Sequence, residues 1–275
     1  NDTHPALAIP ELLRIMIDEE GMDWETACGI CRKVFSYTNH TVMSEALEKW
    51  PEDLFKELLP RIYAIVKGIN EDYCRKLWQF YPGQWEKIGS MAIIGYNEIR
   101  MANLCVAMSG HVNGVSRLHG EILKQDVFKS FFLVEPWKFT SVTNGITPRR
   151  WLMDANPALC ELLDDAIGED YKRDLTALAK LEPLAADAAF QERFAEVKRF
   201  NKRRFADWLQ RKQGAMVDPD TVFDVQSKRA HEYKRQLMNL LHVISLYDRL
   251  LNEPDFDMPP TTFLLAAKAS ANYAV

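Results

Sequence analysis

The chain has 275 residues, an apolar fraction of 47% and a formal net charge of −5, which is enough for two domains with their own cores. An acidic chain lacks the basic face that nucleic-acid binding requires, so a basic cluster within it suits a small anion. No apolar run reaches the roughly 18 residues of a membrane-spanning helix, and no signal-peptide pattern is present. We therefore expect a cytoplasmic protein that binds neither nucleic acid nor membrane.

The first half of the chain reads as helices separated by short extended segments. Apolar residues at three- and four-residue spacing predict helices over residues 6–21, 22–34, 44–78 and 97–110. Pro51 and Pro60 break the third of these helices. Residues 35–41 read as a strand that runs into a loop, and residues 111–120 read as a glycine-containing turn.

A junction follows at KFTSVTNGITPRRW, where a short strand runs into Asn144-Gly145 and Pro148 opens a helix. Beyond it the spacing predicts helices over residues 157–168, 188–214 and 232–251. Residues 221–226 and 261–268 read as strands. The order strand, helix, strand is typical of a parallel α/β sheet.

The five cysteines are scattered and odd in number, as in a reducing compartment. Cys28 and Cys31 form a CxxC pair inside a helical stretch, with no second pair to complete a metal site. We expect them to pack in a core, in preference to redox or metal chemistry.

Five cationic or titratable side chains crowd together in this acidic chain: Lys228, Arg229, His231, Lys234 and Arg235. Their loop follows a predicted strand and precedes a predicted helix, so it lies where open α/β sheets bind ligands. The free N–H groups of the helix's first turn favour an anion there. One continuous helix would point Arg229 and Lys234 about 140° apart, whereas a strand–loop–helix corner lets both reach one phosphate. The alternative is a capped helix with solvated charges, in which Glu232 pairs locally.

Other polar stretches leave their roles open. Asn144-Gly145 is either a plain turn or a close approach to a ligand, and Arg149-Arg150 at a helix start opposes the helix dipole. His4 and His40 stand in polar loops, where a hydrogen-bonded structural role is the commoner one. No HExxH, GxSxG, P-loop or GxGxxG pattern occurs, so proteases, lipases, NTPases and NAD enzymes have no support.

Several long motifs together resemble the α-glucan phosphorylases, the family of glycogen, starch and maltodextrin phosphorylase. In order, they are NDTHPALAIPELLRI, FSYTNHTVMSEALEKWP, VNGVSRLHGEILK, VTNGITPRRWL, NPALCELL and FDVQSKRAHEYKRQLMNLLHVISLY. The resemblance runs from Asn1 to about Lys268 and covers only a central segment of the family's chain.

The resemblance implies an α/β fold of the glycosyltransferase-B type, with two domains and an active site in the interdomain cleft. Residues 1–143 would be the last part of the N-terminal domain, and residues 144–275 the first part of the C-terminal, cofactor-binding domain. The implied reaction transfers a terminal α-1,4-glucosyl unit of a glucan to inorganic phosphate and gives glucose 1-phosphate with retained configuration. The implied cofactor is pyridoxal 5′-phosphate, used through its phosphate as a proton relay.

The family's motifs carry roles onto particular residues of this sequence. Arg229 and Lys234 resemble the ligands of the substrate phosphate, and Lys228 the residue that touches the cofactor phosphate. Trp151 resembles a residue lining the cofactor pocket. The residues that resemble contacts on the sugar side are Tyr233 and Asn144 at the glucosyl unit, His40 near its 6-hydroxyl, and Asp2 and His4 on the glucan-acceptor side.

The family's cofactor-attachment lysine follows a glycine-rich motif farther along, outside this chain. We therefore expect a segment of a longer protein that is inactive alone and exposes apolar surface. The resemblance also implies that the full-length protein is a homodimer. A non-catalytic glucan-binding relative is the main alternative. A helical interaction protein with an incidental basic patch is a third reading.

Overall fold

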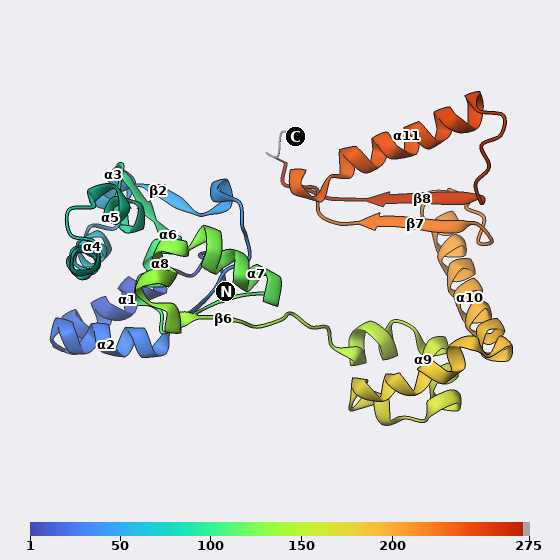
Figure 1. Ribbon diagram of the computed structural model, residues 1–275, viewed down its shortest axis with the longest axis horizontal. Helices are drawn as coiled ribbons and strands as arrows, with labels where there is room; N and C mark the ends of the chain where they lie inside the picture. The colour runs from blue at the N-terminus through green and yellow to red at the C-terminus, as the bar shows by residue number, and fades with distance from the viewer. Residues whose placement is uncertain (272–275) are drawn as a thin grey trace. The chain divides into compact units, whose positions relative to one another are not determined.

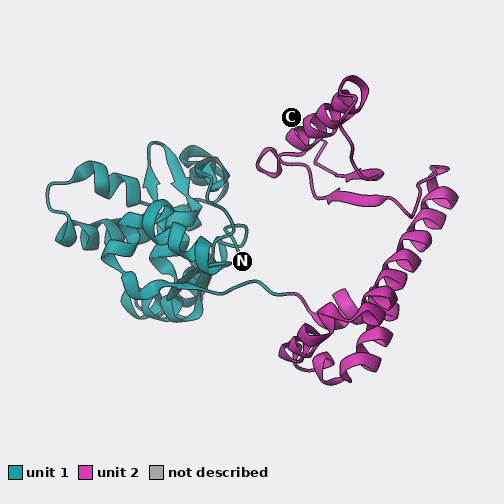
Figure 2. Cartoon of the chain, turned by 45° about the vertical axis from the view of Figure 1, so that its right-hand side comes forward, with its two compact units in different colours: residues 1–145 teal, residues 146–275 magenta. Residues whose placement is uncertain are grey.

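A computed structural model of the chain describes residues 1–271. These form two compact units, and the boundary along the chain lies between Gly145 and Ile146 (Figure 2). The sequence places the boundary two residues earlier, before Asn144. Both units combine helices with small sheets, as the predicted α/β class requires. None of the described helices is long and apolar enough to cross a membrane.

Unit 1 is built around a helix that is buried on every side. All eight residues of α6 (Met101–Met108) are buried, and α4 and α1 turn apolar faces toward the same core (Figure 1). The helices of unit 1 are α1 (Ala8–Arg14), α2 (Trp24–Val34), α3 (Glu52–Leu58), α4 (Pro60–Phe80), α5 (Trp85–Met91), α6, α7 (Arg117–Ile122) and α8 (Lys129–Val134). A helix this apolar needs neighbours all round, which explains its central place.

Two three-stranded sheets complete unit 1. The strands are β1 (Ser36–Thr38), β2 (Lys49–Pro51), β3 (Ile94–Gly95), β4 (Glu98–Arg100), β5 (His111–Gly114) and β6 (Phe139–Ser141). The first sheet has the order β1-β5-β6 with both pairs parallel, and the second has the order β2-β4-β3 with both pairs antiparallel. In the parallel sheet Thr38 lies opposite Asn113, and Gly114 opposite Ser141.

Three predictions for unit 1 need correction. Residues 49–51 and 98–100 form strands where helix is predicted, and residues 111–114 form a strand where a turn is predicted. Each strand has three or four residues, too few to show an alternating pattern, and partners distant in sequence decide its conformation. The break at Pro60 is confirmed, since Pro60 is the first residue of α4.

The buried side chain of Lys138 connects the end of α6 to the start of β6 and also forms an ion pair with Glu135. Lys138 Nζ donates to the carbonyl of Val106 at 3.0 Å and lies 3.2 Å from Glu135 Oε2. Both side chains are buried, and burial lowers the pKa of Lys138 although Glu135 opposes that shift. A cation at the last carbonyls of a helix is favourable there, so this pair fixes where β6 enters the sheet.

The described residues of unit 2 form three α-helices and one parallel strand pair. Its helices are α9 (Pro157–Ile167), α10 (Ala188–Gln213) and α11 (Gln236–Asn252), and its strands are β7 (Val222–Ser227) and β8 (Thr261–Ala266). The two strands pair in parallel over six residues, from Val222 opposite Thr261 to Ser227 opposite Ala266, as the strand–helix–strand order predicts. Figure 1 shows α11 running alongside this pair.

Much of the apolar surface of unit 2 is exposed, as expected for this chain. In the described residues α11 has no buried side chain, and Leu237, Tyr247 and Leu251 are more than half exposed. Unit 1, in contrast, buries a continuous core. The chain therefore holds most of its packing energy in unit 1.

Replacing Gly114 by alanine tests how closely α7 must approach β5. A Cβ at Gly114 would lie 2.8 Å from the backbone N of Gly120, which cannot yield as a side chain can. We predict a loss of roughly 1–3 kcal/mol in the free energy of unfolding, measured by denaturant titration.

The matched control is Gly29→Ala inside α2, where a Cβ meets nothing within 4 Å. This change should stabilise the helix by roughly 0.5–1 kcal/mol. Equal effects of the two substitutions would contradict the close approach of α7 to β5.

Candidate functional site

The carboxyl ends of β1, β5 and β6 form one edge of the parallel sheet in unit 1. Three loops leave this edge: residues 39–43 after β1, residues 115–116 after β5 and residues 142–145 after β6. They carry two of the predicted sugar contacts, His40 and Asn144, whose side chains are exposed. Parallel pairing thus brings together residues more than a hundred positions apart in sequence.

Buried Asn39 anchors the loop that carries His40. Its backbone N–H donates to the carbonyl of Asn113 at 3.0 Å, and its side-chain amide donates to the Tyr37 hydroxyl at 3.0 Å. Burial raises the pKa of Tyr37, so the phenol stays protonated. The loop is therefore fixed at Asn39 while the next residue, His40, faces solvent.

Asp2 and His4 lie beside the same edge. The backbone N–H of Asp2 donates to the carbonyl of Thr38 at 2.8 Å, and His4 Nε2 lies 4.0 Å from Asp2 Oδ2. Between them, the Thr3 hydroxyl donates to Glu48 Oε2 at 2.6 Å. Glu48 also accepts from the Trp50 indole at 2.9 Å, and sequence reasoning did not single out this carboxylate.

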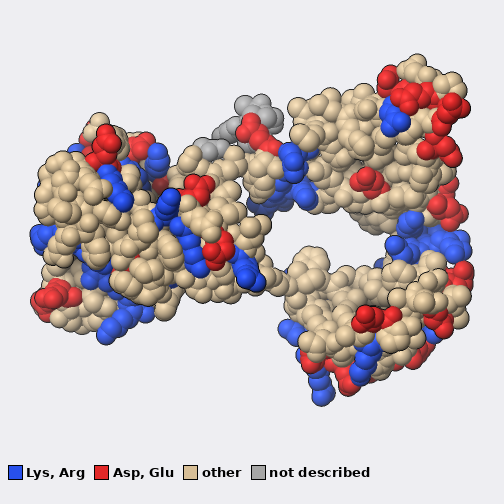
Figure 3. All heavy atoms as spheres, viewed as in Figure 1, with Lys and Arg blue, Asp and Glu red and all other residues tan. Residues whose placement is uncertain are grey.

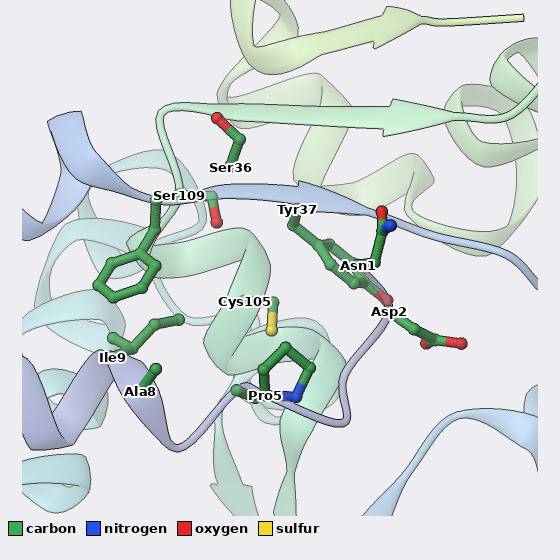
Figure 4. A pocket seen from close by; sticks show the side chains of 11 residues that line it. Asn1, Asp2, Pro5, Ala8, Ile9, Ser36, Tyr37, Cys105 and Ser109 are labelled. Atoms are coloured by element: carbon green, nitrogen blue, oxygen red, sulfur yellow. The ribbon is translucent and has the colours of Figure 1, made fainter.

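The pocket next to Asp2 is a poor candidate for a sugar. It measures about 110 Å³, and Pro5, Ile9, Tyr37 and Cys105 give it a mainly apolar lining (Figure 4). Ligand pockets usually measure roughly 300–1,000 Å³ and carry convergent polar groups. The exposed loops at the sheet edge, and not this pocket, therefore form the candidate site of unit 1.

The second candidate site lies at the carboxyl end of β7 and β8 in unit 2. A hollow of about 340 Å³ is lined by Ser227, Lys228, Arg229, Ala266, Ala267 and Lys268. The strand ladder continues into its walls, because Lys228 N–H donates to the Ala266 carbonyl and Ala230 N–H to the Lys268 carbonyl, each at 3.0 Å. Figure 3 shows Lys and Arg side chains gathered at this end of the strand pair.

Three cations line this hollow, and one of them was not a predicted site residue. Lys228 and Arg229 are predicted phosphate contacts, whereas Lys268 comes from the end of β8. The parallel pairing of β7 with β8 delivers Lys268 to the same place. Two point charges and one planar guanidinium suit a phosphate group, whose oxygens accept from all of them.

Lys234 and Tyr233 stand on a separate turn before α11, whereas the sequence predicts them in the first turn of the helix itself. Residues Glu232–Lys234 form a single 3₁₀ turn, Arg235 adopts a left-handed conformation with φ of 55°, and α11 begins only at Gln236. Lys234 is thus outside the first turn of α11 and does not line the hollow. Its Nζ lies 5.5 Å from the centre of the Tyr233 ring, which is 58% exposed.

Amide side chains that the sequence analysis passed over hold this loop in place. Gln236 donates to the Arg229 carbonyl at 3.0 Å and accepts from the His231 N–H at 3.3 Å. Gln226 donates to the Lys234 carbonyl at 3.2 Å and accepts from Asn239 at 3.0 Å. These bonds take the place of a regular helix start, which explains why the turn and α11 are separate.

Trp151 and the CxxC pair have different surroundings. Trp151 lies in a π-helical turn, Arg149–Asp154, and its side chain is 62% exposed. Cys28 and Cys31 are buried in the core of unit 1, and burial raises the pKa of Cys31 to about 11, which confirms the predicted packing role. Among the described residues, no three or more His, Cys, Asp or Glu side chains are placed so that they could hold a metal ion.

Comparisons with known proteins agree with the resemblance in the motifs. The model of the carbohydrate phosphorylase family matches residues 1–275. Glycogen phosphorylase of Bacillus subtilis is 49% identical over 273 residues, which are 99% of this chain and 34% of that protein. The muscle form of glycogen phosphorylase from Mus musculus is 47% identical and the brain form from Ovis aries 48% identical, each covering 99% of this chain and 33% of the relative. The chain therefore spans about a third of the length of the curated relatives it matches.

Gln236→Ala tests whether this side chain fixes the cationic loop. The change removes the acceptor of the His231 N–H and the donor to the Arg229 carbonyl, so we predict faster amide exchange at His231. The expected loss of unfolding free energy is about 1 kcal/mol, as for a partly exposed hydrogen bond.

Gln213→Ala, at the exposed end of α10, is the matched control and should leave both quantities unchanged. Unchanged exchange at His231 in Gln236→Ala would show that the loop is held by other contacts.

Proposed function

The chain belongs to the carbohydrate phosphorylase family, and from that premise we propose that the natural protein containing it is an α-glucan phosphorylase. It would transfer a terminal α-1,4-glucosyl unit of glycogen or maltodextrin to inorganic phosphate. The glycosidic C1–O4 bond breaks, a phosphate oxygen bonds to C1, and the proton that the hydrogen phosphate loses ends on O4 of the departing, shortened glucan. The observation that carries this proposal is the cationic hollow at the end of β7 and β8.

The residues of unit 2 fit the phosphate side of this reaction. Lys228, Arg229 and Lys268 line one hollow, and preorganised cations stabilise the charge that develops as the glycosidic bond breaks. Lys234 remains a proposed phosphate ligand, although it stands on the separate turn beside Tyr233. Its flexible side chain would reach the anion as a point charge.

The residues of unit 1 fit the sugar side. The side chains of His40 and Asn144 stand exposed at one sheet edge, where a glucosyl unit offers hydroxyls as donors and acceptors. We propose that His40 lies near the 6-hydroxyl and that Asp2 and His4 face the glucan acceptor. Tyr233, on unit 2, is a further proposed sugar contact.

The proposed cofactor is pyridoxal 5′-phosphate, and the described residues fit part of it. Lys228 would hold its phosphate in the cationic hollow, and the exposed indole of Trp151 would line its ring. When bound, the cofactor supplies a phosphate whose second pKa near 6 suits proton exchange with the substrate phosphate at neutral pH. The attachment lysine is proposed to lie outside this chain.

The remaining proposals concern the whole protein. We propose a glycosyltransferase-B architecture, a cytoplasmic location and a homodimeric state for the natural protein. The 275-residue chain by itself is proposed to be inactive, because it covers only about a third of the length of its curated relatives.

Substitutions in the cationic hollow test the proposed reaction. In the natural protein, Arg229→Gln should lower turnover by roughly 10²–10³, the usual cost of removing a preorganised transition-state donor. Lys268→Gln should raise the KM for phosphate roughly tenfold, the cost of one charge-assisted hydrogen bond. The measurement is the rate of glucose 1-phosphate formation from maltodextrin at varied phosphate concentration.

Lys212→Gln, at the exposed end of α10, is the control for loss of one positive charge and should change neither constant. If Arg229→Gln and Lys212→Gln behave alike, phosphate is bound elsewhere and the proposed assignment is wrong.

Absorbance spectroscopy tests the cofactor. The purified natural protein should absorb as a pyridoxal compound, and removal of the cofactor should abolish phosphorolysis while glucan binding remains. Glucan binding without such absorbance or turnover would instead support the non-catalytic relative.

A further inference from the structure

His119 forms a bridge between the loops at the sugar-side edge of unit 1. It lies in α7, and its ring touches two of the loops that leave the parallel sheet. Its Nδ1 accepts from the backbone N–H of Val115 at 3.1 Å, and its Nε2 lies 3.3 Å from the carbonyl oxygen of Thr41. Thr41 is the residue after His40, so the bridge ends beside a proposed sugar contact.

The two backbone partners determine the protonation of the ring. A backbone N–H can only donate, so Nδ1 must be the unprotonated nitrogen. A backbone carbonyl can only accept, so Nε2 must carry the hydrogen. The bridge thus needs one acceptor and one donor at opposite positions of a single side chain, which a neutral imidazole supplies.

The bridge extends to the third loop through the backbone. The carbonyl of Val115 accepts from the N–H of Asn144 at 2.9 Å, and the carbonyl of Gly114 accepts from the N–H of Val142 at 3.1 Å. His119 is therefore connected through Val115 to the loop that carries Asn144. One imidazole holds two loops directly and the third through one peptide unit.

The position of the ring is itself fixed by α7. The N–H of His119 donates to the Ser116 hydroxyl at 3.0 Å, which caps the start of the helix. Next to it, Gly114 and Gly120 approach so closely that a Cβ on Gly114 would lie 2.8 Å from the Gly120 nitrogen. The ring is held against the sheet edge and cannot adapt by moving away with its helix.

We propose that His119 is a positioning residue for glucan binding, acting through the His40 and Asn144 loops without touching the sugar. This inference rests on the proposed function, because it takes that sheet edge as the sugar side. All contacts of the bridge belong to unit 1, whereas the cationic hollow belongs to unit 2. Loss of the bridge should therefore weaken glucan use and leave phosphate use intact.

The test compares two substitutions at this position in the natural protein. His119→Phe keeps a ring but removes both nitrogens, and it should lower kcat/KM for maltodextrin roughly tenfold, as expected for two lost hydrogen bonds. His119→Gln keeps one acceptor and one donor, and it should stay within about threefold of the parent. The KM for phosphate should be unchanged in both variants.

His111→Phe is the matched control, because His111 is exposed at the opposite end of β5. This variant should keep the parental kcat/KM for maltodextrin and the parental KM for phosphate. Equal losses of kcat/KM in His119→Phe and His119→Gln would overturn the proposal, since the loss would then come from altered packing and not from the missing hydrogen bonds. An equal rise in the KM for phosphate would overturn it as well, as would a His119→Phe variant with parental kcat/KM.

Amide hydrogen exchange separates this inference from the proposed function. If the parent protein forms no glucose 1-phosphate, the proposed function is wrong and the values of kcat/KM cannot be compared. The bridge still predicts faster exchange at Val115 and Asn144 in His119→Phe than in His111→Phe. Unchanged exchange at both amides would overturn the bridge.

Discussion

Parallel pairing of short strands is the constraint on which both candidate sites depend. In a parallel pair the carboxyl ends lie together, so the loops after each strand leave from one edge. In unit 1 this edge collects residues that follow β1, β5 and β6. In unit 2 it collects the residues after β7 and β8, including Lys268, which is close to Arg229 only because of that pairing. The strand topology therefore gathers positive charge at one sheet edge, in a chain whose net charge is negative.

Strands of three to six residues give the loops after them little support, and polar side chains supply hydrogen bonds that the strand ladders do not. The Asn39 side chain at the end of β1 accepts from the backbone N–H of Thr41 at 2.9 Å. The Gln236 side chain at the start of α11 accepts from the His231 N–H and donates to the Arg229 carbonyl. A buried unpaired peptide group costs free energy, so such residues hold a loop in one conformation. His119 does the same for two loops at once. Most side chains proposed to meet ligands, such as those of His40, Asn144 and Arg229, are exposed, while the residues that position their loops make the hydrogen bonds.

The sequence is informative about the longer helices, about the two six-residue strands of unit 2 and about local order. Strand, loop and helix around Arg229 follow from periodicity, and the parallel pairing of the flanking strands follows from their order. The interruption at Arg235 is different, because a single left-handed residue leaves the apolar spacing of the helix pattern intact. Likewise β2 and β4 are too short to carry a period of their own, and distant partners create them.

The side-chain contacts of the sites could not be predicted for a related reason. Lys268 and Arg229 are 39 positions apart in the sequence, and no residue pattern near either one indicates that both line the same hollow. The bridge from His119 to Thr41 spans 78 positions. A lone histidine in a sequence has many structural roles, and only the two backbone partners show which one applies here. Motif resemblance nominates residues such as His40, Asn144 and Arg229 because they stand in contiguous motifs, and their side chains are exposed. Their contacts with ligands stay a prediction.

Phosphate binding in the hollow at the end of β7 and β8 is decided by a crystal structure of the natural protein with bound glucose 1-phosphate. We expect phosphate oxygens within hydrogen-bond distance of Arg229 and Lys268. A phosphate bound away from both side chains, with the hollow filled only by water, would show that the hollow is not the phosphate site.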